Sequence, residues 1–222
     1  MRYRGVLFDL DGTLLYTLGD LTSATNRVLG LLSFPPRSEE EIMGMIGDGF
    51  EPLIRRAVPA GAEIPDFSAA SAEFRRFYLE HMTDTTRPYE GIVHLLGRLA
   101  ASGCVAGVVS NKFDEASKAL VGKYFGNLIG YTVGVHGGNT RKPSPVMIFE
   151  AMEYFGLEKE ETIYIGDSPS DLITAGNAGI SFAAAAWGYR SREVLCAAGA
   201  EYVFGSPREL EAYLFGGKNG AE

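Results

Sequence analysis

Near its N-terminus the chain reads Phe8-Asp9-Leu10-Asp11-Gly12-Thr13-Leu14, the stretch that decides the fold. It continues the short run Tyr3–Phe8, whose apolar and aromatic residues are typical of a strand buried on both faces. Asp9 and Asp11 are two positions apart, so in an extended segment their side chains share one face. At the carboxyl end of a strand they would lie in the crevice where open α/β sheets bind ligands.

A purely structural interpretation competes with this one. Asp11-Gly12 between apolar runs is a common signal for a β-hairpin turn. A turn alone does not explain Asp9, which would then point a bare carboxylate into a buried strand end. Nor does it explain the carboxylates that recur downstream. A turn directly after the acidic pair is compatible with both interpretations.

Two further apolar runs also end in a polar residue. Val105–Val109 ends at Ser110, and Thr162–Gly166 ends at Asp167. Helical patterns alternate with these runs and cover Pro88–Ala101, Asp114–Phe125 and Pro145–Phe155. Alternating strands and helices predict an α/β fold, with a parallel sheet sandwiched by helices and right-handed crossovers. Two later apolar segments would add edge strands, Ile180–Trp187 and Glu201–Phe204.

The segment from Tyr16 to Thr83 differs from the rest because it has helix signals and no convincing strand. Ser38 and Glu41 have the spacing of a capping box, and they precede an apolar helical pattern. Prolines punctuate the segment at Pro35-Pro36, Pro59 and Pro65. We therefore predict a helical insertion between the first strand and the rest of the sheet.

A second acidic segment, Gly166-Asp167-Ser168-Pro169-Ser170-Asp171, follows the third strand. Asp167 or Ser168 is also a candidate N-cap for a helix that begins near Pro169. Two carboxylates about 4 Å apart repel by roughly 4 kcal/mol at an effective dielectric constant of 20, so gathering Asp9, Asp11 and Asp167 costs on the order of 10 kcal/mol. Such a cluster needs a cation. Oxygen ligands without nearby His or Cys select a hard ion, and a half-open site predicts Mg²⁺.

The remaining polar residues suit a bound phosphate. Ser110 and Asn111, at the end of the second strand, offer a hydroxyl and a backbone N–H. Lys142 offers a positive charge in a proline-stiffened loop that leads into a helix. An isolated lysine is usually a surface residue, but an acidic cluster that admits an anion needs a positive counterweight.

In this order, the four segments resemble the motifs of the haloacid dehalogenase-like hydrolase superfamily. The segments are Asp9–Leu14, Ser110-Asn111, Lys142-Pro143 and Gly166–Asp171. The resemblance implies a Rossmann-like catalytic core of residues 1–15 and 84–222, with residues 16–83 as a small α-helical cap domain. The chain looks most like the phosphoglycolate phosphatase group, on the segments Pro35–Glu41, Ile46–Gly49, Trp187–Arg190 and Ala198–Tyr202. Tyr16 and Arg141 depart from the pattern of that group.

The resemblance also implies roles. Asp9 would be the nucleophile that forms an aspartyl-phosphate, and Asp11 the general acid and base. Mg²⁺ would be held by Asp9, the backbone carbonyl of Asp11, and Asp167, with Asp171 supporting its waters. Ser110, Asn111 and Lys142 would bind the phosphoryl oxygens. Substrate choice would lie with the cap, where the turn Gly47–Gly49 is a candidate.

Several rival functions share this pattern. A phosphomutase or a pyrophosphatase could use the same scaffold. A signalling receiver domain also combines an acidic pocket with Ser/Thr and Lys, but it lacks the helical insertion and has no use for Asp11. A dehalogenase would need neither Asp11 nor the metal, and a binding protein with a degenerate site would not keep every motif residue.

The composition of the chain limits the classes of binding partner that we expect. The formal net charge is −8 and no basic stripe is present, which argues against nucleic acid as the main partner. No apolar run approaches the roughly 20 residues of a membrane-spanning helix. Two cysteines in apolar settings, and no signal-peptide core near the first residue, favour a cytoplasmic protein. We expect a small phosphorylated metabolite as the substrate and make no prediction of oligomeric state.

Overall fold

The computed structural model describes residues 3–216, which form two compact units. The core unit comprises the described residues up to Tyr16 and from Pro88 onward, and the helical unit comprises Thr17–Arg87. The sequence predicted an insertion over residues 16–83. That this unit acts as a cap stays a prediction.

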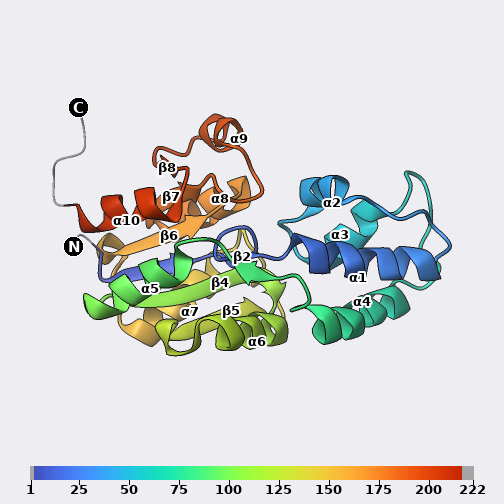
Figure 1. The fold of residues 1–222 in the computed structure, drawn as a ribbon, viewed down its shortest axis with the longest axis horizontal. Helices are drawn as coiled ribbons and strands as arrows, with labels where there is room; N and C mark the ends of the chain where they lie inside the picture. The colour runs from blue at the N-terminus through green and yellow to red at the C-terminus, as the bar shows by residue number, and fades with distance from the viewer. Residues whose placement is uncertain (1–2, 217–222) are drawn as a thin grey trace. The chain divides into compact units, whose positions relative to one another are not determined.

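Within the described residues, six parallel strands form the sheet of the core unit, in the order β5-β4-β1-β6-β7-β8 (Figure 1). They are β1 (Gly5–Phe8), β4 (Val105–Phe113), β5 (Tyr131–Val135), β6 (Thr162–Gly166), β7 (Ser181–Ala185) and β8 (Val203–Phe204). Phe8 at the end of β1 pairs with Val108 of β4 and Ile165 of β6. Asp9 and Asp167, which follow β1 and β6, therefore lie at the same edge of the sheet, and the last residues of β4 extend along that edge. The predicted α/β fold with a parallel sheet is confirmed.

Helices cover the sheet of the core unit. They are α5 (Ile92–Ala101), α6 (Asp114–Tyr124), α7 (Val146–Phe155), α8 (Pro169–Ala178), α9 (Arg192–Ala197) and α10 (Pro207–Phe215), with short 3-10 turns at Gly126–Leu128 and Lys159–Glu161. α7 and α8 contact each other and pack on the central strands, whereas α5 and α10 contact each other on the opposite face (Figure 1). Leu7, Val109 and Tyr164 are fully buried in the apolar layer beneath α7 and α8.

Two strands differ from the prediction. β4 was expected to end at Val109, but it continues to Phe113 and shifts its register against β5 between these two residues. Ser110 and Asn111 therefore lie inside a strand and not after it. The apolar run did not reveal this continuation, because this part of β4 faces the site with polar side chains. β5, Tyr131–Val135, was not predicted. It is an edge strand, partly exposed and interrupted by Gly134, so it lacks a continuous apolar run.

The helical unit contains α1 (Leu18–Leu31), α2 (Glu39–Met45), α3 (Phe50–Ala57) and α4 (Phe67–His81). The capping box of Ser38 and Glu41 is present at the start of α2, as predicted. Short strands occur where the chain passes between the units, β2 (Leu15–Tyr16) paired with β3 (Arg87–Pro88), so Tyr16 is extended and not helical. Among the described residues, no helix combines the length and the apolar character that a membrane crossing requires.

One buried carboxylate stabilises the helical unit. Asp20, in the first turn of α1, is 2% exposed. Its Oδ1 accepts hydrogen bonds from the backbone N–H (2.9 Å) and hydroxyl (2.6 Å) of Thr85, and its Oδ2 accepts the same pair from Thr86 at 3.0 and 2.7 Å. These four donors tie the start of the unit to its end. No pattern in the sequence points to Asp20.

Candidate active site

Asp9 directly follows β1 at the edge where the central strands end. Its backbone N–H donates to the Ile165 carbonyl at 2.8 Å, which fixes the residue against β6. Its Oδ1 accepts a hydrogen bond from the N–H of Leu10 at 2.7 Å and lies 3.0 Å from Lys142 Nζ. Burial raises the pKa of Asp9 to about 7, and the opposing attraction of Lys142 only partly offsets that burial.

Lys142 is the buried cation of the site, with its side chain 1% exposed. Besides Asp9, its Nζ donates to Asp171 Oδ1 at 2.7 Å and to the Tyr164 hydroxyl at 3.0 Å. Burial alone would lower the pKa of Lys142, but the carboxylates of Asp171 and Asp9 outweigh it and raise the pKa. The ammonium group is therefore a fixed positive charge between two acidic residues.

Asp171 lies in the first turn of α8 and uses both carboxylate oxygens. Oδ1 accepts from Lys142 and from the Tyr164 hydroxyl (3.1 Å), and Oδ2 accepts from the N–H (3.1 Å) and hydroxyl (2.6 Å) of Ser168. Ser168 is the N-cap of α8, so the structural interpretation of this segment holds for Ser168. Asp167 is not used as the cap and lies instead beside Asp9 and Asp171.

Asp167, between β6 and α8, is 3% exposed. Its Oδ2 accepts the N–H of Tyr189 at 2.7 Å. Burial, followed by the negative charges of Asp171 and Asp9, raises the pKa of Asp167 well above its usual range. One oxygen each of Asp9, Asp167 and Asp171 lies within 4.8 Å of the others, a spacing that could hold a metal ion.

The charges of this group fit a divalent cation. Three buried carboxylates and the ammonium of Lys142 leave a formal charge of −2 in a site shielded from water. All the side-chain donors are oxygens, which suits Mg²⁺. The predicted ligand set was Asp9, the Asp11 carbonyl, and Asp167. In the structure the carboxylate of Asp171 lies beside those of Asp9 and Asp167. The carboxylate of Asp11 forms a separate ion pair.

That pairing is with Lys112, a residue that the sequence analysis missed. Lys112 Nζ lies 3.0 Å from Asp11 Oδ2, and the lysine side chain is 3% exposed. The spacing in the sequence could have indicated Lys112. It is two positions after Ser110, so in an extended strand the two side chains share one face. Asp11 thus has a buried cation of its own.

Ser110 and Asn111 are both buried on β4. The Asn111 side chain accepts the N–H of Lys142 at 2.7 Å, and its amide nitrogen donates to the Lys142 carbonyl at 3.4 Å. Asn111 therefore holds the backbone of the lysine loop on both sides. The Ser110 hydroxyl accepts the N–H of Lys112 at 3.3 Å, which leaves its proton available to a ligand.

Comparison with known proteins gives the family. Residues 6–185 match the family model of the haloacid dehalogenase-like hydrolases. The chain belongs to this family. The predicted family and the predicted enzyme class, a phosphatase-like hydrolase, are confirmed.

Individual relatives refine the group. A phosphoglycolate phosphatase of Rhodospirillum rubrum is 35% identical over 95% of this chain and 90% of its own length. An N-acetylmuramic acid 6-phosphate phosphatase of Pseudomonas aeruginosa is 30% identical, over 95% and 94% of the two chains. The crystal structure of a predicted phosphoglycolate phosphatase from Haemophilus somnus superposes with a TM-score of 0.89 at 26% identity, covering 96% of this chain and 99% of that one. The chain thus falls in the phosphoglycolate phosphatase-like group.

Proposed function

We propose that the protein is a Mg²⁺-dependent phosphatase that hydrolyses a small phosphorylated metabolite through an aspartyl-phosphate on Asp9. One observation carries this proposal. Asp9, at the carboxyl end of β1, shares a buried lysine with Asp171 and lies beside Asp167 in a group of carboxylates with a net negative charge. The named activities of the relatives support it, since each acts on a phosphate ester.

The surroundings of Asp9 suit a nucleophile. Both donors to its carboxylate, the Leu10 N–H and Lys142 Nζ, lie at Oδ1, so among the described residues Oδ2 has no donor. We assign the attack on phosphorus to this oxygen. The bond from Asp9 to phosphorus forms as the bond to the leaving alkoxide breaks. A bound Mg²⁺ supplies the positive charge that offsets repulsion between the carboxylate and the phosphate.

Asp11 fits the general acid and base. In the first step it gives a proton to the leaving alkoxide, and in the second it takes a proton from the water that hydrolyses the aspartyl-phosphate. Lys112 holds one oxygen of Asp11 at 3.0 Å and so restricts its orientation. This lysine is a positioning residue in our account. Lys142, Ser110 and the backbone of Asn111 are assigned to the phosphoryl oxygens.

Substrate class and location are part of the same proposal. Phosphoglycolate and sugar phosphates are the candidates, because the relatives are named for such substrates. The turn Gly47–Gly49 joins α2 to α3 in the helical unit, where Asp48 forms an ion pair with Arg56. We keep this turn as the candidate specificity segment. A cytoplasmic location agrees with the free thiols of Cys104 and Cys196.

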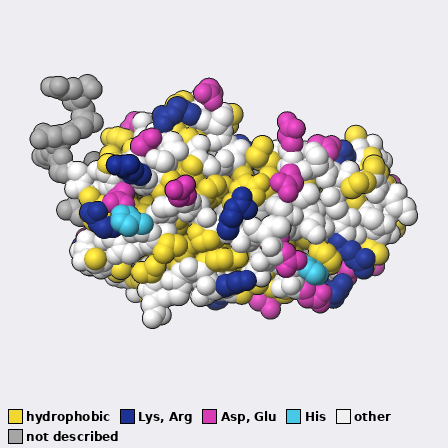
Figure 2. Space-filling view, viewed as in Figure 1, with side chains coloured by type: hydrophobic (Ala, Val, Ile, Leu, Met, Phe, Trp, Pro, Cys, Tyr) yellow, Lys and Arg dark blue, Asp and Glu magenta, His cyan; other side chains and the backbone are white. Residues whose placement is uncertain are grey.

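We propose no nucleic-acid partner. On the face shown in Figure 2, Lys and Arg side chains are scattered among acidic ones. Binding to a duplex would need them gathered in a stripe.

The test is the release of inorganic phosphate from phosphoglycolate, N-acetylmuramic acid 6-phosphate, other sugar phosphates and pyrophosphate, with and without Mg²⁺. We expect release from at least one monoester, only with Mg²⁺, and a loss of about 10⁴-fold or more in Asp9→Asn. Full activity in this variant contradicts the mechanism. Isomerised sugar phosphate without phosphate release indicates a phosphomutase, and cleavage of pyrophosphate alone indicates a pyrophosphatase.

A further inference from the structure

The tripeptide Trp187-Gly188-Tyr189 contacts the site from the end of β7. Trp187 Nε1 donates to the Thr13 carbonyl at 2.9 Å, and the Tyr189 N–H donates to Asp167 Oδ2 at 2.7 Å. The Gly188 N–H donates back to the Ala185 carbonyl at 3.2 Å, which closes the turn. Three consecutive residues thus connect the acidic turn after β1 with the carboxylate after β6.

Packing at this point leaves no room for a side chain on Gly188. A Cβ atom there would overlap the Gly12 carbonyl and the side chain of Asp167. Gly12 faces the same contact from the other side, with φ +80°, and a Cβ on it would overlap Asp167 and come within 2.7 Å of the Tyr189 ring. Two glycines therefore let the backbone of the 187–189 turn press directly on Asp167.

The hydrogen bond to Asp167 decides how its carboxylate is oriented. Among the described residues, the Tyr189 N–H is the one donor to this buried side chain. With Oδ2 engaged in that bond, Oδ1 is the oxygen left for a cation. Partners of this kind orient the ligands of a metal and typically change its affinity 10- to 100-fold when they are lost.

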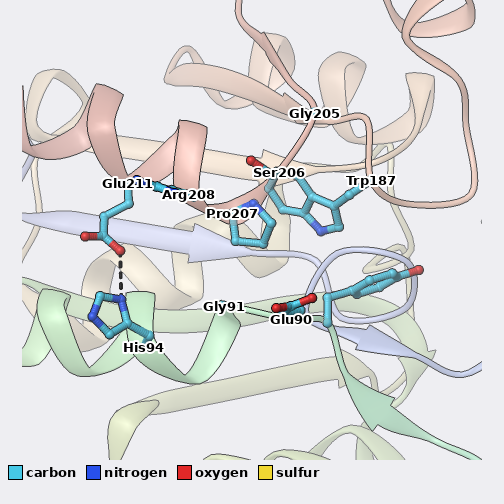
Figure 3. Close-up of a pocket in the computed structure, with 10 residues that line it drawn as sticks. Glu90, Gly91, His94, Trp187, Gly205, Ser206, Pro207, Arg208 and Glu211 are labelled. Atoms are coloured by element: carbon cyan, nitrogen blue, oxygen red, sulfur yellow. Dashed lines mark hydrogen bonds and ion pairs between the residues drawn. The ribbon is translucent and has the colours of Figure 1, made fainter.

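Trp187 can be altered without disturbing the apolar core. Its indole ring lines a pocket of about 530 Å³ together with Tyr89, Pro207 and residues around them (Figure 3). The ring is partly exposed, while its Nε1 points to the carbonyl of Thr13. A phenylalanine there keeps an aromatic ring against the pocket, although a smaller one, and removes the donor.

We propose that the Trp187–Tyr189 turn is a positioning element for the cation site, which sets the orientation of Asp167 and the place of the Gly12–Thr13 turn beside it. This inference rests on the proposed Mg²⁺ site and names the residues that shape it.

The test is a calorimetric titration of the full chain with MgCl₂, without substrate. We expect Gly188→Ala to weaken Mg²⁺ binding roughly 10- to 100-fold, because the added methyl displaces Asp167. Gly176→Ala is the matched control. Gly176 lies on the exposed side of α8 with open space around its Cα, so wild-type Mg²⁺ affinity is expected.

Trp187→Phe gives a second reading if Gly188→Ala does not fold. Loss of one hydrogen bond to the turn is expected to weaken Mg²⁺ binding roughly 3- to 10-fold, with the KM for substrate at saturating Mg²⁺ unchanged. Wild-type Mg²⁺ affinity in Trp187→Phe, or in a folded Gly188→Ala, overturns the inference while leaving the proposed function intact. A wild-type protein that binds no Mg²⁺ overturns both.

Discussion

Two buried carboxylates of this chain, Asp20 in the helical unit and Asp167 in the core unit, differ in what surrounds them. Asp20 is 2% exposed and accepts four hydrogen bonds, two on each oxygen. Asp167 is 3% exposed and accepts one, and two further carboxylates lie beside it. The two carboxylates are therefore buried to nearly the same extent, but hydrogen-bond donors surround Asp20, whereas other negative charges surround Asp167.

The difference separates a structural carboxylate from a functional one. A buried anion is tolerated when donors replace its hydration, as the threonines do for Asp20. Asp167 lacks those donors, and its neighbours raise its pKa further. A cation would supply what the missing donors do not. Counting donors around the buried carboxylates of the described residues thus points to Asp167, and to Asp9 with its unengaged Oδ2, without reference to any relative. Asp171, with two donors on each oxygen, resembles Asp20 in this respect.

Removing the single cation of the carboxylate group should have the largest effect. Lys142→Met leaves Asp9 and Asp171 without their buried partner, so we expect a loss of about 3–5 kcal/mol in the free energy of unfolding in metal-free buffer. Urea denaturation measures it. Lys118→Met is the control, since Lys118 pairs with Asp114 on the surface and its loss should cost at most about 1 kcal/mol. Equal effects of the two variants would remove the distinction between the regions.

Asp20→Asn probes the structural carboxylate. The new amide nitrogen faces donors where an acceptor oxygen was, so we expect a loss of about 2–3 kcal/mol in unfolding free energy. Mg²⁺ affinity should stay as in the wild type. Asp66→Asn is the control, because Asp66 caps α4 through the Ala69 N–H and asparagine caps a helix equally well. A stability in Asp20→Asn equal to that of the control would show that the four bonds contribute nothing.

Glu73 gives the smallest effect and a pH dependence. Hydrogen bonds from Arg76 and Arg27 lower its pKa from 4.5 to about 2. Because the folded-state pKa is the lower one, the stabilisation is complete above pH 4.5 and is lost as the pH falls toward 2. Glu73→Gln should therefore lower the urea midpoint slightly at pH 7, and the gap to the wild type should narrow at pH 3. A gap of constant size at the two pH values would contradict this origin.

The sequence predicted those parts of the site that follow a continuous apolar strand. Asp9 and Asp167 end buried runs, so strand order and a shared edge were sufficient to bring them together. Lys112 escaped because β4 was expected to end at Val109, whereas its polar continuation reaches Phe113. Asp20 escaped because its donors, Thr85 and Thr86, lie more than 60 positions away in the chain. Partners fixed by tertiary packing leave no local pattern.

The central claim is that Asp9 and Asp167, in the carboxylate group that they form with Asp171, bind one divalent cation. Calorimetric titration of the wild type and of Asp167→Asn with MgCl₂ tests it most directly, with Asp20→Asn as the matched exchange at the satisfied carboxylate. The account predicts one Mg²⁺ per chain in the wild type and in Asp20→Asn, and an affinity lower by at least about 100-fold in Asp167→Asn, because affinity at such sites follows the charge of the ligands. Wild-type affinity in Asp167→Asn, or no Mg²⁺ binding to the wild type, would contradict it.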